Sequence, residues 1–238
     1  MKAKQFIRIL CVAIPAIFAL SSCNANGKYV AYNGTVAHSY WTFSFGTVYH
    51  ELPDVDPDSF ESLENWLGRD KSHAYFRDKI IDNANPSTLK AEHFPLSRDR
   101  KDYYFEAKAL RVADMKAFKV LKWYDTSMWA RDNRYAYYDS IRIDTPDIES
   151  FRVVSHCVAV DSKNVYRYGK ILPLADPATY QESWKGFYSR DKAHIWYLGT
   201  LLEDADYASF VVDSDNAAHD SRGSFDGADR TKAAPPAE

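Results

Sequence analysis

The chain has 238 residues, with 30 Lys and Arg against 33 Asp and Glu, so its formal net charge at pH 7 is −3. A mildly acidic chain without a basic stripe argues against nucleic acid as a partner. Aromatic residues make up 15% of the sequence, with 17 Tyr and 6 Trp, and the length is ample for a substantial core.

Residues 1–22 predict a secretory signal peptide. Lys2, Lys4 and Arg8 precede an apolar run from Ile9 to Leu20. That run has about a dozen residues, fewer than the roughly 20 that span a bilayer as a helix. We therefore expect an exported protein and not one held by a transmembrane helix.

The signal peptide ends in Leu20-Ser21-Ser22-Cys23. This sequence resembles the lipobox of bacterial lipoproteins, which implies that the Cys23 thiol receives a diacylglycerol and that the chain is cut just before it. An unmodified cysteine after an ordinary signal is the alternative. Asn24 favours the outer over the inner membrane, so we expect a cell-envelope protein held by lipid on Cys23, on the periplasmic side or the surface. Residues 23–45 would then be the lipidated N-terminus and its tether.

One cysteine is left after this processing, Cys157, so no intramolecular disulfide can form. It lies in the run VVSHCVAV, which reads as a strand. Adjacent residues of a strand point to opposite faces, so Cys157 and His156 are not expected to act together. A small buried hydrophobic residue is the interpretation that we adopt.

Residues 69–89, RDKSHAYFRDKIIDNANPSTL, share a skeleton with residues 190–210, RDKAHIWYLGTLLEDADYASF. An Asp opens each of five copies, and these origins are separated by 29, 33, 29 and 30 residues: Asp70, Asp99, Asp132, Asp161 and Asp191. Five residues on there is an aromatic: Tyr75, Tyr104, Tyr137, Tyr166 and Trp196. Eleven on there is an aliphatic: Ile81, Leu110, Ile143, Leu172 and Leu202. Fifteen on there is Asn85, Asp114, Asp147, Asp176 or Asp206, and nineteen on there is Leu89, Phe118, Phe151, Tyr180 or Phe210. Such fixed spacing defines an internal repeat of about 30 residues.

Each conserved position of the repeat has a structural interpretation. The origin Asp starts a polar turn between two β-prone runs, which predicts a β-hairpin. Gly169 and Gly199 mark the next bend. The Asn or Asp at position fifteen predicts a helix N-cap, supported by a following Pro in NPSTL and DPATY and by a partial earlier copy, DPDSF.

The predicted fold class is α+β and β-rich. We expect a tandem array of about five to six repeats over residues 46–212, each a β-hairpin plus a short helix, in a solenoid-like or partly closed arrangement. The aromatic positions five and nineteen would form the core. Residues 213–238 lose apolar content after a decayed copy starting at Asp215, and we expect them to be disordered.

The segments DNRYAYY (132–138), DSKNVYRYG (161–169) and DKAHIWYLG (191–199) carry a resemblance to the DKNYY family of bacterial repeat proteins. The second copy, DRKDYYFEA, departs most because it lacks the Gly and the usual cap dipeptide. The resemblance implies an exported setting and no assigned activity.

No catalytic, cofactor or metal site is predicted. The repeated acids already have backbone roles as turn formers and caps, whereas catalytic sites combine unlike residues. His73 and His194 occupy the same position of different repeats and do not form metal-ligand spacing. The segment DSDN (213–216) lacks the Gly and Glu of a calcium loop.

We therefore expect a lipid-anchored, non-enzymatic interaction module, because stacked repeats build extended surfaces. The alternative is glycan or peptidoglycan binding through exposed aromatics, for which the aromatics outside the conserved positions are the candidates: Trp123, Trp129, Trp184 and Tyr188. A periplasmic hydrolase ranks last, since it would need a pocket that joins unlike repeats.

Overall fold

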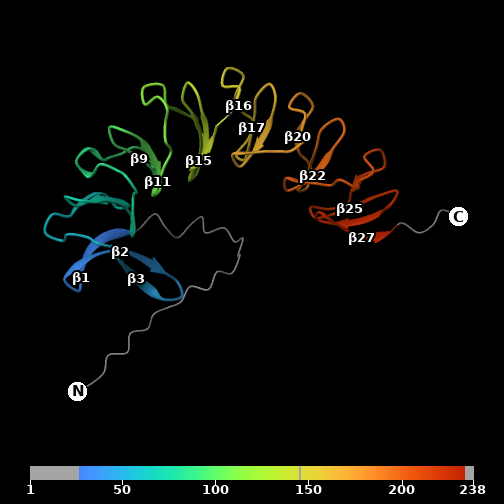
Figure 1. Cartoon of the computed structure of the whole chain (residues 1–238). Coiled ribbons are helices and arrows are strands. Elements are labelled where there is room, and N and C mark those ends of the chain that lie inside the picture. Colours follow the sequence, from blue (N-terminus) through green and yellow to red (C-terminus); the bar gives the residue numbers. More distant parts are fainter. Residues whose placement is uncertain (1–26, 145, 234–238) are drawn as a thin grey trace.

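The computed structural model describes residues 27–144 and 146–233, which form seven small antiparallel sheets. The sheets follow one another along an arch, from the blue end to the red end in Figure 1. Every strand pairs with its neighbours in the chain, so each sheet is a meander and no strand crosses from one sheet to another. The contacts between sheets are therefore made by side chains and loops.

The first sheet, here called the N-terminal sheet, consists of β1 (Lys28–Tyr32), β2 (Thr35–Thr42) and β3 (Gly46–Glu51). The two-residue turn between β1 and β2 is Asn33-Gly34, and both residues have positive φ, at 51° and 80°. Asn-Gly is the pair most typical of such a hairpin turn. The prediction that residues up to 45 are a tether was thus wrong for residues 28–45.

Six four-stranded sheets follow, here called repeat sheets 1 to 6. Repeat sheet 1 consists of β4 (Glu61–Glu64), β5 (Leu67–Arg69), β6 (Ala74–Phe76) and β7 (Lys79–Ile80). Repeat sheet 2 consists of β8 (Lys90–Ala91), β9 (Leu96–Arg98), β10 (Tyr103–Phe105) and β11 (Lys108–Ala109). Repeat sheet 3 consists of β12 (Lys119–Tyr124), β13 (Ser127–Arg131), β14 (Ala136–Tyr138) and β15 (Ile141–Ile143). Repeat sheet 4 consists of β16 (Arg152–Val153), β17 (Val158–Val160), β18 (Val165–Arg167) and β19 (Lys170–Ile171). Repeat sheet 5 consists of β20 (Gln181–Lys185), β21 (Tyr188–Arg190), β22 (Ile195–Tyr197) and β23 (Thr200–Leu201). Repeat sheet 6 consists of β24 (Val211–Val212), β25 (Ala217–Asp220), β26 (Gly223–Asp226) and β27 (Asp229–Ala233).

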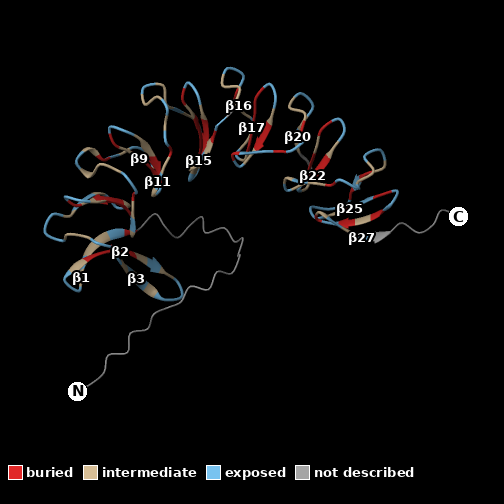
Figure 2. Cartoon of the chain, in the orientation of Figure 1, coloured by how far each residue is buried: buried red, intermediate tan, exposed pale blue. Residues whose placement is uncertain are grey.

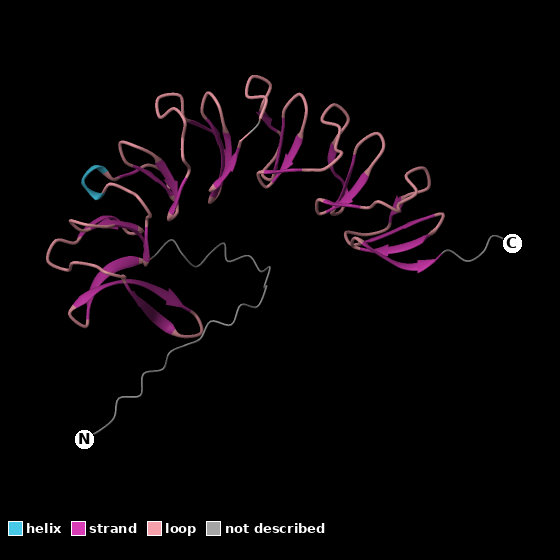
Figure 3. Ribbon diagram, in the orientation of Figure 1, coloured by secondary structure: helices cyan, strands magenta, loops and turns pink. Residues whose placement is uncertain are grey.

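The chain is nearly all β, so the α+β prediction was wrong. Within the described residues, the one helical element is the short 3₁₀ turn η1 (Pro86–Thr88), which Figure 3 shows in cyan. The side chain of Asn85 does cap it, accepting a hydrogen bond from the Ser87 N–H at 3.0 Å. However, β8 begins at Lys90, so the capped turn has no room to continue. Isolated helical turns are unfavourable because nucleation fixes several residues for a single hydrogen bond.

The C-terminal segment is also ordered up to Ala233, where disorder had been predicted. Residues 217–233 supply β25, β26 and β27 of repeat sheet 6. Asp220 is the equivalent of the origin Asp, lies 29 residues after Asp191, and is buried. The copy that the sequence suggested at Asp215 therefore starts five residues later.

The core runs along the array, and Figure 2 shows buried residues in each repeat sheet and exposed residues in the loops. All five aromatics at position five are buried, as predicted, and all five aliphatics at position eleven are buried as well. At position nineteen Leu89, Phe151 and Phe210 are buried, whereas Phe118 and Tyr180 are half-buried. Aromatics at position nineteen contact the aromatic at position five of the next repeat. Ring centroids lie between 5.4 and 6.1 Å apart in the pairs Phe60–Tyr75, Phe118–Tyr137, Phe151–Tyr166, Tyr180–Trp196 and Phe210–Phe225. Each sheet thus completes its core with a side chain from its neighbour.

Candidate functional site

The repeated Asp is the feature most suited to chemistry, and Asp132 shows its geometry. One carboxylate oxygen, Oδ1, accepts the backbone N–H groups of Arg134 at 2.7 Å and Tyr135 at 2.6 Å. The other, Oδ2, accepts the Tyr137 hydroxyl at 2.8 Å and the N–H of Ala113 at 2.8 Å. Asp132 therefore binds its own turn, the next strand and the loop before its sheet.

The other repeats reuse this arrangement. The tyrosine hydroxyl lies 2.8 Å from the carboxylate in Asp70, 2.9 Å in Asp99 and 2.6 Å in Asp161. The N–H of the preceding loop donates to the origin Asp at 2.7 to 2.9 Å in the pairs Asp56–Asp70, Asn85–Asp99, Asp147–Asp161, Asp176–Asp191 and Asp206–Asp220. This bond fastens each sheet to the one before it.

The hydrogen bonds keep these carboxylates ionised. Burial disfavours the charged form, but the N–H groups and the tyrosine hydroxyl outweigh it and lower the pKa of Asp70 to about 2. The same balance lowers the pKa of Asp99, Asp132 and Asp161. The pKa of Asp191 is also lowered, against burial, by backbone N–H groups and by the His194 side chain. An ionised carboxylate whose oxygens are already occupied as acceptors is poorly suited to act as a general base near neutral pH.

Repeats 5 and 6 lack the tyrosine and replace its hydroxyl differently. Trp196 stands at that position in repeat 5, where the Nδ1 atom of His194 lies 3.3 Å from the carboxylate of Asp191. Phe225 stands there in repeat 6, where Arg230 donates from Nη1 and Nη2 to Asp220 at 2.8 and 2.9 Å. Both substitutions retain a buried carboxylate with a neighbouring donor, which indicates a structural role.

The Asp at position fifteen also joins two repeats. Asp56 accepts from Lys71 Nζ at 2.8 Å, and Asp176 accepts from Lys192 Nζ at 2.9 Å. Lys71 and Lys192 each directly follow an origin Asp. Asp147 accepts from the hydroxyl of Ser162 at 2.6 Å in the same way. These acids face the next turn and do not converge on a common pocket.

Two of the four aromatics that were predicted to face a ligand are buried. Trp129 and Tyr188 have exposed fractions of 0%, so the prediction that they face a ligand was wrong. The Trp129 indole donates to the carbonyl of His156 at 2.9 Å, and the Tyr188 hydroxyl donates to the carbonyl of Asn216 at 3.0 Å. A further position of the repeat could have identified both as core residues. An apolar residue stands three positions before each of the five origin Asp residues of the sequence analysis, and all five of these residues are buried.

Trp123 is half-buried, with its ring centroid 4.4 Å from that of His93. The side chain of Trp184 and the whole of Cys23 lie outside the described residues.

Sequence reasoning missed the three most exposed aromatics among the side chains that the structure describes. Trp41, Phe43 and Phe45 surround the β2–β3 turn with exposed fractions of 59%, 92% and 81%. The signal was available, because residues 29–50 contain no Asp, Glu, Lys or Arg. Assigning this stretch to a tether hid it.

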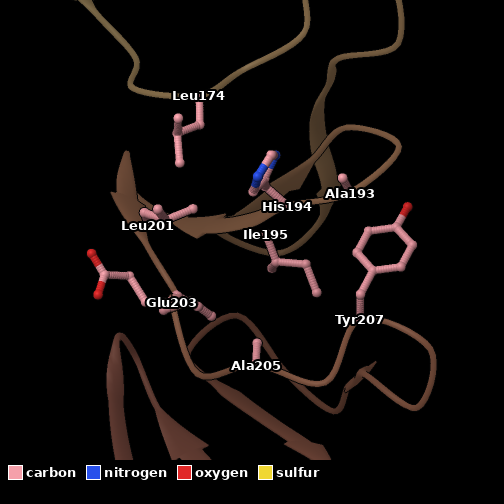
Figure 4. A pocket seen from close by; sticks show the side chains of 9 residues that line it. Leu174, Ala193, His194, Ile195, Leu201, Glu203, Ala205 and Tyr207 are labelled. Carbon is pink, nitrogen blue, oxygen red and sulfur yellow. The ribbon is translucent and has the colours of Figure 1, made fainter.

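The surface grooves lie beside the hairpins. One, of about 230 Å³, is shown in Figure 4: Leu174 lies across from His194 and Leu201, with Glu203 and Tyr207 at the edge. Its volume is below the roughly 300 Å³ typical of small-molecule pockets. No serine or cysteine lines it, and His194 is paired with Asp191. A second, larger groove of about 450 Å³ includes Arg111, Arg142 and Asp144.

Two further sets of residues contain side-chain types that are common in catalytic sites, and both have structural partners. The Tyr40 hydroxyl lies 3.0 Å from Nε2 of His50, whose Nδ1 lies 3.5 Å from Asp78, so this chain links the N-terminal sheet to repeat sheet 1. Cys157 is half-buried and just precedes β17. Its thiol donates to Glu182 at 3.0 Å, and burial together with that bond raises the pKa of the thiol, which keeps it protonated.

Among the described residues, no three His, Cys, Asp or Glu side chains are placed to hold a metal ion. That part of the chain also contains no helix long and apolar enough to cross a membrane.

Comparison with known proteins agrees with the repeat architecture. The DKNYY family matches residues 40–200 of the chain. No curated protein and no solved structure matches. The matched span includes the first five origin Asp residues.

Proposed function

The chain belongs to the DKNYY family, and we propose that it is a lipid-anchored, non-enzymatic repeat protein of the cell envelope that binds another envelope molecule through its extended surface. The observation that carries this proposal is the use of the repeated carboxylates. Each origin Asp is buried and occupied in fastening one repeat to the next. What remains for function is the extended surface of the arch, since repeat proteins use such extended surfaces to bind partners.

The anchor is proposed from the sequence Leu20-Ser21-Ser22-Cys23, and Asn24 favours the outer membrane. The mature chain would begin at Cys23. Since one acyl chain gives only marginal membrane binding, stable attachment rests on the several chains of a mature lipoprotein.

The anchor is tested by incorporation of labelled fatty acid. Parent and Cys23→Ala chains are expressed in the same cells, and we expect label and membrane association in the parent only. A matched control is Cys157→Ala, which leaves the anchor intact and should keep both. A Cys23→Ala chain that still takes up label would contradict the proposal.

Glycan or peptidoglycan binding remains the second candidate, because some aromatic rings outside the core are exposed. Tyr168 has an exposed fraction of 46% and Phe187 of 48%, on repeats 4 and 5. Exposed aromatic rings can stack on sugar faces. Co-sedimentation with peptidoglycan that is reduced by Tyr168→Ala, and not by Lys163→Ala, would favour this candidate over a protein partner.

A further inference from the structure

The β2–β3 turn carries an unusual set of side chains, here called the aromatic tip: Trp41, Phe43 and Phe45. Their exposed fractions of 59%, 92% and 81% are the largest among the aromatics of the described residues, and the rings of Trp41 and Phe43 meet edge to face at 6.3 Å. A cluster of exposed large apolar side chains usually marks an interaction site.

The aromatic tip is held in place by its own turn. The Thr42 hydroxyl accepts from the Phe45 N–H at 3.1 Å and donates to the Gly46 carbonyl at 3.3 Å. The turn therefore presents its rings outward without further ordering.

The surrounding sheet is free of formal charge. Residues 29–50 contain no Asp, Glu, Lys or Arg, and the exposed Lys28 stands just before them. No charged side chain would have to lose water if the tip entered an apolar environment, and Lys28 could meet anionic headgroups. Trp is typical of the membrane interface, where its ring sits at headgroup level.

The start of β1 lies toward the same end of the N-terminal sheet as the aromatic tip. Lys28 pairs with Ser39 in the antiparallel β1–β2 ladder, so β1 begins toward the end of the sheet at which β2 enters its turn. From Ser39 to Phe43 the strand covers about 13 Å at about 3.3 Å per residue. From Lys28, the partner of Ser39, back to Cys23 an extended chain covers at most about 18 Å. The linker is thus long enough to reach the level of the tip and too short to extend far beyond it.

We propose that the aromatic tip rests in the headgroup region of the bilayer that holds the acyl chains of Cys23. This inference rests on the proposed lipid anchor. Cys23 cannot lie farther from the N-terminal sheet than its short linker allows, so the bilayer surface is brought to the level of the tip. Anchor and tip would together make two contacts with the membrane, both at the N-terminal end of the arch, which Figure 1 shows in blue.

The test places an environment-sensitive fluorophore at the tip of the acylated full-length protein. Phe43→Cys is labelled in a Cys157→Ser background, since acylated Cys23 does not react, and the protein is reconstituted in phosphatidylethanolamine–phosphatidylglycerol vesicles. The matched control is Leu198→Cys, an exposed apolar position on the β22–β23 turn, far along the arch. Quenching by spin-labelled lipid and by aqueous iodide is then compared between the two probes.

We expect the probe at residue 43 to be quenched severalfold more by spin-labelled lipid than the probe at residue 198, and to be protected from iodide. Equal access of iodide to both probes would overturn the proposal, as would protection without lipid quenching, which instead indicates a second copy or another protein on the tip. Fatty-acid labelling of the same preparation tests the anchor separately. Labelled protein with an iodide-accessible tip refutes the tip alone, whereas unlabelled protein refutes the anchor.

Discussion

A buried carboxylate in every repeat would normally destabilise a fold, because removing a charge from water is costly unless it is paired or hydrogen-bonded. Here hydrogen bonds from neighbouring groups offset that cost. Asp132 has four donors, three of them backbone N–H groups, and the fourth is the Tyr137 hydroxyl. The Asp and Tyr of the repeat are thus a single structural unit at the scale of residues.

Removing the hydroxyl of Tyr137 should therefore weaken the fold without creating a cavity. We expect Tyr137→Phe to lower the free energy of unfolding by about 1.5 to 3 kcal/mol, the range for hydrogen bonds to charged groups. The control is Tyr135→Phe, two residues away, where the ring lies over the guanidinium groups of Arg134 and Arg142. Denaturant titration of both variants checks this, and equal effects would contradict the special role of Tyr137.

The same carboxylates predict a sensitivity to acid. The pKa of Asp70 is about 2 in the folded chain and about 3.9 for an unfolded Asp. Because the folded value is the lower one, the stabilisation is complete above about pH 4 and is lost as the pH falls toward 2.

Since the other origin Asp residues shift in the same direction, several protons should be taken up together on unfolding in this range. The urea midpoint, measured from pH 7 to 2, should stay level and then fall steeply below about pH 4. Asp70→Asn should make that fall shallower. A midpoint independent of pH down to 2 would show that these carboxylates are not held ionised.

At the scale of elements, the repeat was predicted correctly as a hairpin around the origin Asp and incorrectly as a hairpin plus helix. Asn or Asp followed by Pro is a genuine capping signal, and Asn85 confirms it locally. What the signal does not contain is the length of the element that follows. Leu89 is already buried in the core, so the chain returns to a strand after one turn.

Position fifteen should accordingly tolerate loss of charge but not loss of its oxygen. Asp176 Oδ1 accepts from the Ala178 N–H at 3.1 Å and Oδ2 accepts from the Thr179 hydroxyl at 2.9 Å. Asn keeps the Oδ1 acceptor for the backbone N–H, and its amide group can donate to the Thr179 hydroxyl oxygen in place of the second bond. We expect Asp176→Asn to change the melting temperature little, since an exposed ion pair such as the one with Lys192 contributes little to stability. Asp176→Ala removes the accepting oxygen and should lower the melting temperature measurably more than Asp176→Asn does.

Calcium provides the complementary measurement for position fifteen. If Asp176 is a turn cap, added calcium should shift the melting of neither the parent nor the variants. A stabilisation by calcium that Asp176→Asn abolishes would contradict the capping role.

At the scale of the whole molecule, the sequence predicted the middle of the array better than its ends. Fixed spacing at four positions identifies the five copies, whereas repeat sheet 6 has Phe225 in place of the tyrosine and Arg230 in place of its hydroxyl. Its remaining signals are the spacing of Asp220 from Asp191 and the aromatic Phe225 five residues later. The N-terminal sheet has none of the recurring residues of the repeat, and only the pair Asn33-Gly34 indicated a hairpin there. The aromatic tip was missed because this stretch had been predicted to be a tether.

An array in which each sheet contacts mainly its neighbours should lose stability locally. Trp196 is fully buried in repeat sheet 5 and packs against Tyr180 from the loop before it. We expect Trp196→Ala to cost about 3 to 5 kcal/mol, as for other large-to-small core changes. Hydrogen exchange read by mass spectrometry should show lost protection in repeat sheets 4, 5 and 6, while repeat sheets 1 and 2 keep theirs. Lys192→Ala, in the turn of the same repeat, should leave the whole pattern nearly unchanged. Uniform loss of protection along the chain would contradict this expectation. It would mean that the seven sheets unfold as one unit, so that the aromatic contacts and the hydrogen bonds to the origin Asp residues couple distant repeats as well as neighbouring ones.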